Sequence, residues 1–404
     1  MPAAPTGTHD LMPSSRATSA AFGAAFFFLP LSKPLTFASL AVAAVLLIAG
    51  GGLRDAIRVR RLPPWGAAAV ALAALPVLSL FVHADGLANT EYLSLSYYWL
   101  FALLVHEAAK RMPISGWLLA YVAGTLVTFA YAQAKALGWS GMASEPTALR
   151  NAILYSQVLA VGIIVCALLH RESMRRGARI AYWAAIGLLA YGLANGMGRT
   201  GWVTLLVLMP LVVASLLPAR GLRVVIAGCA VGAIALMMTP AAQMRIGHLA
   251  QDLASLRVGE TRGSLGYRLE MWRTAGHVFA EHPLVGAGPK AFQREWPQRF
   301  PDRLERFAEP HNAYVFYAAA YGLPGLAALL LLFAANLVRG WRHRDVLAGS
   351  LTFAFAVVCI LGSLTNTMLV GTTSALMMML FIGLQGNLLY PATRAAKRVP
   401  AGSA

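Results

Sequence analysis

Long apolar stretches alternate with short polar links along most of the chain. Segments of about 20 apolar residues are typical of transmembrane helices, because a helix of that length crosses the hydrocarbon core of a bilayer. We predict twelve such spans, at residues 18–32, 35–50, 64–83, 91–108, 114–136, 151–169, 180–197, 200–217, 222–239, 313–337, 346–365 and 368–389. The pattern predicts an all-α polytopic membrane protein.

One long polar interval interrupts this alternation, at residues 240–312. It holds 10 of the 33 Lys and Arg residues and 8 of the 16 Asp and Glu residues. We therefore divide the chain into spans one to nine (1–239), a large loop (240–312), spans ten to twelve (313–390) and a tail (391–404). A loop that holds half of the carboxylates of a membrane protein is the expected place for recognition.

Two segments of the loop have helical patterns. Residues 265–279 show amphipathic spacing, with apolar side chains three or four positions apart. In residues 289–308 four large apolar residues recur every four positions, and two prolines interrupt them: Phe292, Trp296, Phe300 and Leu304, with Pro297 and Pro301. This aromatic stripe fits either an interfacial belt on lipid headgroups or a surface that stacks on sugars.

Composition and charge agree with a membrane protein. The chain is 58% hydrophobic and only 12% charged, with a mean hydropathy of +0.63, which excludes an ordinary soluble domain. In a soluble protein, a net charge of +17 would suggest a nucleic-acid partner. Here 19 basic residues fall on one side of the predicted membrane, and the opposite short links hold only Lys33, Lys135, Arg150 and Arg199. By the positive-inside rule, both termini are cytoplasmic and the loop is periplasmic, so we predict no nucleic-acid partner.

His311 is the strongest candidate for chemistry, because it lies at the outward mouth of the tenth span. The partial positive charge of a helix N-terminus disfavours imidazolium and helps to keep the ring neutral, as a general base requires. A structural role as an interfacial helix cap explains its position equally well. Glu309, two residues earlier, either orients the ring or opposes the effect of the helix.

Arginines form the second group of candidates. Arg199 lies between two apolar runs, where a charge is expensive unless it serves a function or reaches lipid phosphates. Arg268 and Arg273 flank Trp272 in the loop, and Arg150 precedes the sixth span. Guanidinium groups that converge on one side form a clamp for a diphosphate, because each binds two phosphate oxygens. We find no metal-ligand spacing, and we expect no metal and no cofactor.

Three motifs in this order resemble the O-antigen ligase/polymerase superfamily of membrane glycosyltransferases. They are Gly198-Arg199-Thr200-Gly201, a loop motif running from Gly266 through His282-Pro283-Leu284-Val285-Gly286-Ala287-Gly288, and His311-Asn312 followed by Tyr321-Gly322-Leu323-Pro324-Gly325. The resemblance implies a GT-C-like fold in the bacterial inner membrane, with the active site facing the periplasm. It implies catalytic roles for His311, Arg199 and Arg268. Substrate-binding roles follow for Arg150, Arg273, Trp272, Asn312 and Tyr314.

The same resemblance implies the reaction. An O-antigen ligase moves a glycan from undecaprenyl diphosphate to a sugar hydroxyl of lipid A-core, without a metal and with inversion. A polymerase or a protein O-oligosaccharyltransferase is the nearest alternative, and a lipid-linked glycan flippase or exporter is the alternative of another class. Functional charges gathered on one side of the membrane favour an enzyme over a transporter. The sequence gives no indication of the oligomeric state.

Overall fold

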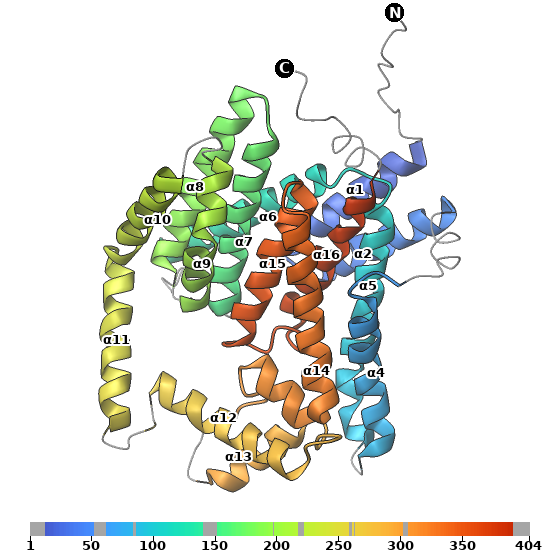
Figure 1. The fold of residues 1–404 in the computed structure, drawn as a ribbon, viewed down its shortest axis with the longest axis vertical. Coiled ribbons are helices and arrows are strands. Elements are labelled where there is room, and N and C mark those ends of the chain that lie inside the picture. Colours follow the sequence, from blue (N-terminus) through green and yellow to red (C-terminus); the bar gives the residue numbers. More distant parts are fainter. Residues whose placement is uncertain are drawn as a thin grey trace, which may run out of the picture.

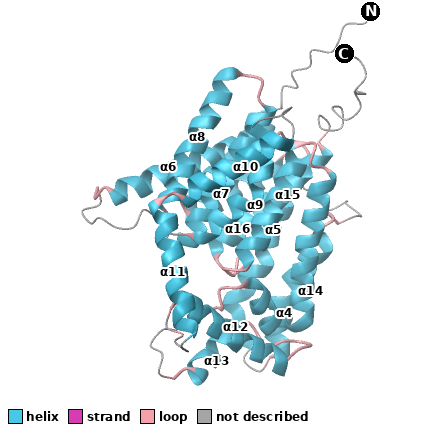
Figure 2. Ribbon diagram, turned by 60° about the vertical axis from the view of Figure 1, so that its left-hand side comes forward, coloured by secondary structure: helices cyan, strands magenta, loops and turns pink. Residues whose placement is uncertain are grey.

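The computed structural model describes residues 13–51, 62–83, 86–139, 152–196, 198–216, 222–257, 261, 263–301 and 306–390. This part of the chain is helical and contains no strand (Figure 2). A helix lies in each of the twelve predicted spans: α1 (Pro13–Phe28), α2 (Lys33–Ala49), α4 (Gly66–Val82), α5 (Ser94–Ala109), α6 (Ser115–Ala136), α7 (Ala152–Glu172), α8 (Arg176–Asn195), α9 (Arg199–Leu216), α10 (Leu222–Met237), α14 (Ala313–Arg342), α15 (Leu347–Ser363) and α16 (Thr372–Gly383). Short 3-10 helices precede α5 (η1, Gly86–Leu93) and follow α16 (η2, Leu384–Leu389).

Six of these helical segments are long and apolar enough to cross a membrane: α6, α7, α8, α9, α14 and residues 372–389. The all-helical polytopic class predicted from the sequence is therefore confirmed. Helix α7 lies at the centre of the bundle, and its residues from Leu154 to His170 are all buried. It is apolar on every side, which is the pattern of a helix with neighbours all around it.

The loop of residues 240–312 is more helical than the sequence predicts. Helix α11 (Pro240–Arg257), which the hydrophobic pattern does not indicate, stands apart from the bundle in Figure 1. Helix α12 (Ser264–Glu281) confirms the predicted amphipathic helix. Among the described residues of the second predicted segment, only α13 (Ala291–Arg299) is helical; it contains Pro297 and ends before Pro301. Helices α12 and α13 lie at the lower ends of α4 and α14 in Figure 1.

A small hydrophobic core of its own holds this loop together. Met271 and Val278 of α12 pack in it with Phe292 and Trp296 of α13, and Trp296 is fully buried. Phe300 packs against the same cluster. Both interpretations of the aromatic stripe, as a belt on headgroups or as a sugar platform, are therefore wrong for Phe292 and Trp296, whereas Phe300 is partly exposed. Leu304 lies outside the described residues.

The predicted span 313–337 is not one straight helix, because α14 breaks at Gly322, which has φ 66° and ψ −158°. The rings of Tyr314 and Phe333 are 6.0 Å apart. In a continuous helix, 19 residues would separate them by about 28 Å along the axis. Residues 313–321 therefore form a short helix folded back along the longer part of α14. Gly325 permits this close return, because a Cβ there would lie 2.6 Å from the Cβ of Tyr321.

The loop motif docks on this break. The backbone N–H groups of Ala287 and Gly288 donate to the carbonyls of Ala319 and Ala320 at 2.9 and 3.0 Å, and Leu323 N–H donates to Pro283 O at 2.8 Å. The first two bonds satisfy carbonyls that the end of the short helix leaves free, and the third satisfies the N–H of Leu323 just after the break. Two of the resembling motifs, 282–288 and 321–325, thus form one structural unit.

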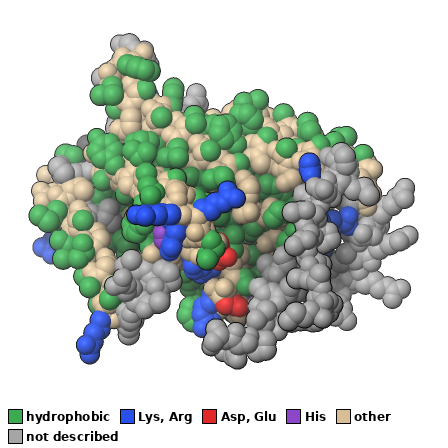
Figure 3. Space-filling model, turned by 90° about the horizontal axis from the view of Figure 1, so that it is seen from above, with side chains coloured by type: hydrophobic (Ala, Val, Ile, Leu, Met, Phe, Trp, Pro, Cys, Tyr) green, Lys and Arg blue, Asp and Glu red, His purple; other side chains and the backbone are tan. Residues whose placement is uncertain are grey.

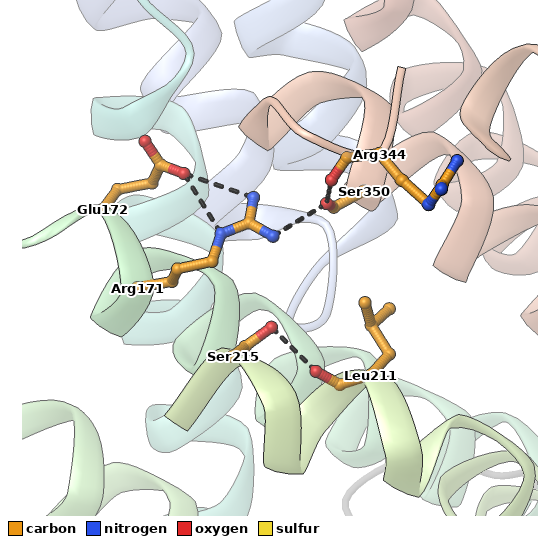
Figure 4. A network of polar contacts seen from close by, with 6 residues as sticks. All are labelled: Arg171, Glu172, Leu211, Ser215, Arg344 and Ser350. Atoms are coloured by element: carbon orange, nitrogen blue, oxygen red, sulfur yellow. Dashed lines mark hydrogen bonds and ion pairs between the residues drawn. The ribbon is translucent and has the colours of Figure 1, made fainter. Parts of the chain in front are cut away.

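Polar contacts tie the helices together at the opposite end of the bundle (Figure 4). Arg171 at the end of α7 donates to Ser350 Oγ at 3.0 Å, and this hydroxyl donates to the carbonyl of Arg344 at 2.6 Å. Lys and Arg side chains gather among apolar ones when the molecule is seen from this end (Figure 3). This is the end that the positive-inside rule assigns to the cytoplasm.

Candidate anion-binding and catalytic site

The position of Arg199 depends on two glycines. Helix α9 begins against the first turns of α7, and a Cβ on Gly198 or Gly201 would overlap Ala152 O and Ser156 O respectively. Ser156 Oγ accepts a hydrogen bond from Gly201 N–H at 3.1 Å. The small residues around Arg199 therefore allow α9 to start on the surface of α7, which fixes the backbone of the arginine.

Arg268 approaches the same place from the loop. It lies four residues after Ser264, the first residue of α12, and both side chains line a pocket of about 280 Å³. The bundle side of the pocket is formed by Arg199, Thr200 and Val203 of α9, Ile153 of α7, and Leu361, Leu364 and Thr365 at the end of α15. The polar loop and the apolar bundle thus meet around one cavity.

The electrostatics of this pocket favour an anion. Three helices, α7, α9 and α12, have first-turn residues in its wall, and helix N-termini carry partial positive charge. None of the described residues that line it is acidic. Burial and the nearby Arg199 lower the pKa of the Arg268 guanidinium, and Asp252 partly opposes them. An anion with several oxygens would relieve the repulsion between the two guanidinium groups.

The segment between α15 and α16 completes the site, and the sequence gives no signal for this. Thr365 Oγ1 and Thr200 Oγ1 lie 2.6 Å apart and share a hydrogen bond. The carbonyl of Leu364 accepts a hydrogen bond of 3.5 Å from Asn312 Nδ2. A threonine in a link between two apolar spans has no distinctive spacing, so only the tertiary structure brings it to the pocket.

The fold-back of α14 brings His311 to this site. His311 has a φ of 50°, an uncommon value for a residue with a side chain, and Asn312 follows it as the N-cap of the short helix. Burial and the charge of Arg268 lower the pKa of the His311 imidazole. The ring therefore stays neutral at pH 7, and 34% of the side chain is exposed. A neutral, accessible imidazole beside an anion pocket has the properties of a general base.

The structure gives Asn312 and Tyr314 partners within the protein. Asn312 Oδ1 accepts from the N–H groups of Tyr314 and Val315 at 2.9 and 3.3 Å. Tyr314 Oη donates to the carbonyl of Ile360 at 3.0 Å. These contacts hold the short helix in place, so the polar groups expected to bind substrate are engaged inside the protein.

The other predicted residues lie less centrally. Trp272 packs against the hydrophobic core of the loop. Arg273 is exposed, and five residues of α-helix turn it about 140° away from Arg268. Arg150 lies outside the described residues. The structure thus brings together Arg199, Arg268 and His311 and separates Arg273 from them.

The described residues thus form a helical membrane protein in which the polar loop and the apolar bundle enclose a pocket lined by two arginines, with a histidine nearby. Residues 183–330 match a family model described as O-antigen ligase, and this segment includes Arg199, Arg268 and His311. This match confirms the resemblance to the O-antigen ligase family seen in the motifs. A search of curated proteins finds no match.

Proposed function

We propose that this protein is an O-antigen ligase, which transfers a glycan from undecaprenyl diphosphate to a sugar hydroxyl of lipid A-core at the periplasmic face of the bacterial inner membrane. The observation that carries the proposal is the convergence of Arg199, Arg268 and His311. They come from the bundle, the loop and the folded-back helix. The two arginines line a pocket with three helix N-termini, beside which His311 lies.

The reaction follows from these side chains. Arg199 and Arg268 bind the diphosphate and stabilise the negative charge that grows on it as the glycosidic bond breaks. His311 accepts the proton of the attacking hydroxyl. Direct attack from the opposite face inverts the anomeric carbon. The apolar wall, with Val203 and Leu361, suits the first prenyl units of a lipid carrier.

The position of the pocket also suits an amphiphilic donor and acceptor. A closed pocket would exclude a polymer attached to a lipid, whereas this pocket lies where a polar loop meets an apolar bundle. A flippase needs polar groups along a path between the two faces. The pocket described here lies at one end of the bundle, which supports an enzyme.

The test is reconstitution. Purified protein in vesicles is mixed with undecaprenyl-diphosphate-linked glycan and lipid A-core, and the products are separated by gel electrophoresis. Attachment of glycan to the core supports a ligase. Growth of the carrier-linked glycan without core supports a polymerase, glycan on an added acceptor protein supports an oligosaccharyltransferase, and no covalent product at all refutes the proposal of a transferase.

A further inference from the structure

A half-buried carboxylate lies beside the histidine of the site. Glu309 Oε1 is 3.6 Å from His311 Nδ1, and the Glu309 side chain is only 19% exposed. His311 Nδ1 is itself buried and makes no hydrogen bond to a described residue. Catalytic hydrogen bonds are often long without substrate and shorten in the complex. A movement of about half an ångström would bring this pair within hydrogen-bond distance.

We propose that Glu309 is a positioning residue that forms a carboxylate–imidazole pair with His311. This inference rests on the proposed function. Glu309 orients the ring through Nδ1–H, and Nε2 is left to act as the base. Because Nδ1 is the buried nitrogen and a third of the side chain is exposed, Nε2 is the nitrogen available to an acceptor hydroxyl.

The proton and the electron pairs balance in this arrangement. The acceptor oxygen forms a bond to the anomeric carbon, and its proton moves to Nε2 of His311. The bond from that carbon to the diphosphate oxygen breaks, and its electron pair leaves with the diphosphate held by Arg199 and Arg268. The imidazolium now carries a positive charge, which the ionised Glu309 carboxylate stabilises through Nδ1–H.

The backbone holds both partners in place. Pro310 between them has a fixed φ, and His311 is held at φ 50° by the N-cap that follows it. A residue in this region of backbone conformation costs free energy and persists only where the surroundings require it. In this conformation His311 Nδ1 lies 3.6 Å from Glu309 Oε1.

The charged and titratable groups around the pair make it sensitive to pH. Tyr92 of η1 lies within electrostatic range of Glu309, Thr367 faces the carboxylate from the α15–α16 segment, and Arg268 of α12 faces the imidazole. Burial raises the pKa of Glu309 to about 7, and the Thr367 hydroxyl opposes this effect. Below that pH, Glu309 takes up a proton and no longer stabilises an imidazolium. The transfer rate of the wild type should fall as the pH falls through about 7.

The first experiment measures initial transfer rate from pH 5 to 9 for the wild type, Glu309→Gln and Glu309→Asp. Glu309→Gln should be about tenfold to a hundredfold slower than the wild type at pH 8. Its transfer rate should stay constant down to a lower pH than that of the wild type, because only His311, whose pKa is lowered, remains to titrate. Glu309→Asp should keep the wild-type profile at a reduced rate. Glu281→Gln, at an exposed position of α12, is the matched control and should match the wild type. A Glu309→Gln variant whose rate falls at the same pH as that of the wild type overturns the proposal.

The second experiment does not depend on transferase activity. Diethyl pyrocarbonate acylates neutral imidazole, and mass spectrometry of the peptide that contains His311 reports its reaction against pH. In the wild type the reaction should show an additional rise near pH 7, where Glu309 ionises and makes Nε2 more nucleophilic through Nδ1–H, and Glu309→Gln should lack this rise. A pH profile that Glu309→Gln leaves unchanged refutes the pair. If the rise is lost but no protein forms product, the pair stands and the proposed function fails.

Discussion

The break in α14 can be tested by replacing Gly322 with alanine. An added Cβ would lie 2.6 Å from the carbonyl carbon and oxygen of Leu284 and 2.7 Å from Pro283 O. These are backbone atoms, so no side-chain rotation relieves the overlap. The conformation of φ 66° and ψ −158° is itself nearly restricted to glycine.

The loss of stability in Gly322→Ala can be worked out from the two ways in which the protein could respond to the added Cβ. If the break persists, the strained backbone alone costs about 1–3 kcal/mol, before the overlap is counted. If the loop motif leaves α14, three hydrogen bonds are lost, at about 1 kcal/mol each. Both responses predict that Gly322→Ala destabilises the protein by about 3 kcal/mol. His311 should also lose its position, because the short helix that it precedes is no longer held.

The assay compares thermal unfolding in detergent and initial transfer rate for Gly322→Ala and Gly276→Ala. Gly276 lies within α12, and a Cβ there meets nothing within 4 Å. This control should be neutral or more stable by up to about 1 kcal/mol, because alanine favours a helix. If Gly322→Ala unfolds at the same temperature as Gly276→Ala and transfers at the wild-type rate, the reasoning about the break is refuted.

Three further predictions concern the site. His311→Ala should abolish transfer while the protein still unfolds cooperatively, and near-normal lipopolysaccharide in cells that carry only this variant contradicts the base assignment. Arg199→Lys and Arg268→Lys should each lose about 3 kcal/mol of transition-state stabilisation, on the order of a hundredfold in initial rate, because lysine lacks the planar fork. The matched control Arg299→Ala removes a partly buried ion pair with Glu295, away from the pocket, and should stay within a few-fold. Wild-type rates in both lysine variants rule out the clamp. Transfer should continue in excess EDTA, and loss of activity that magnesium restores would show a missed metal site.

The helices of the bundle could be predicted from hydropathy because a membrane demands long apolar segments with internal hydrogen bonds. The same measure failed at Gly322. Residues 313–321 and 323–337 are both apolar, and burial against the bundle needs the same kinds of residue as exposure to lipid. In the sequence, only Gly322 and the nearby Pro324 hint at the break. Helix α11 was missed for the opposite reason, since its balanced composition has no dominant apolar side.

Some residues of the candidate site could likewise be predicted from the sequence, and others could not. Arg199 was identified because a charge between two apolar runs is unfavourable unless it has a function. The spacing of apolar residues predicted a helix around Arg268, and the structure has α12 there. Helical spacing alone could not separate Arg268 from Arg273; the family resemblance gave Arg268 the catalytic role, and only packing shows that Arg268 lines the pocket. Asn312 was expected to bind substrate, yet an Asn that directly precedes an apolar run is a common N-cap. That local signal was available and explains its observed hydrogen bonds.

The like charges of the pocket have a practical consequence for anyone who purifies the protein. Arg199 belongs to the bundle and Arg268 to the loop, so their repulsion acts to separate these two parts. A small polyanion that sits between them reverses this force and joins the parts as a bridge. Inorganic pyrophosphate should therefore raise the melting temperature of the wild type, and the increase should grow with the fraction of sites that it occupies. The choice of buffer salt would then alter the apparent stability, and phosphate buffers would hide the affinity of a true donor by competing with it.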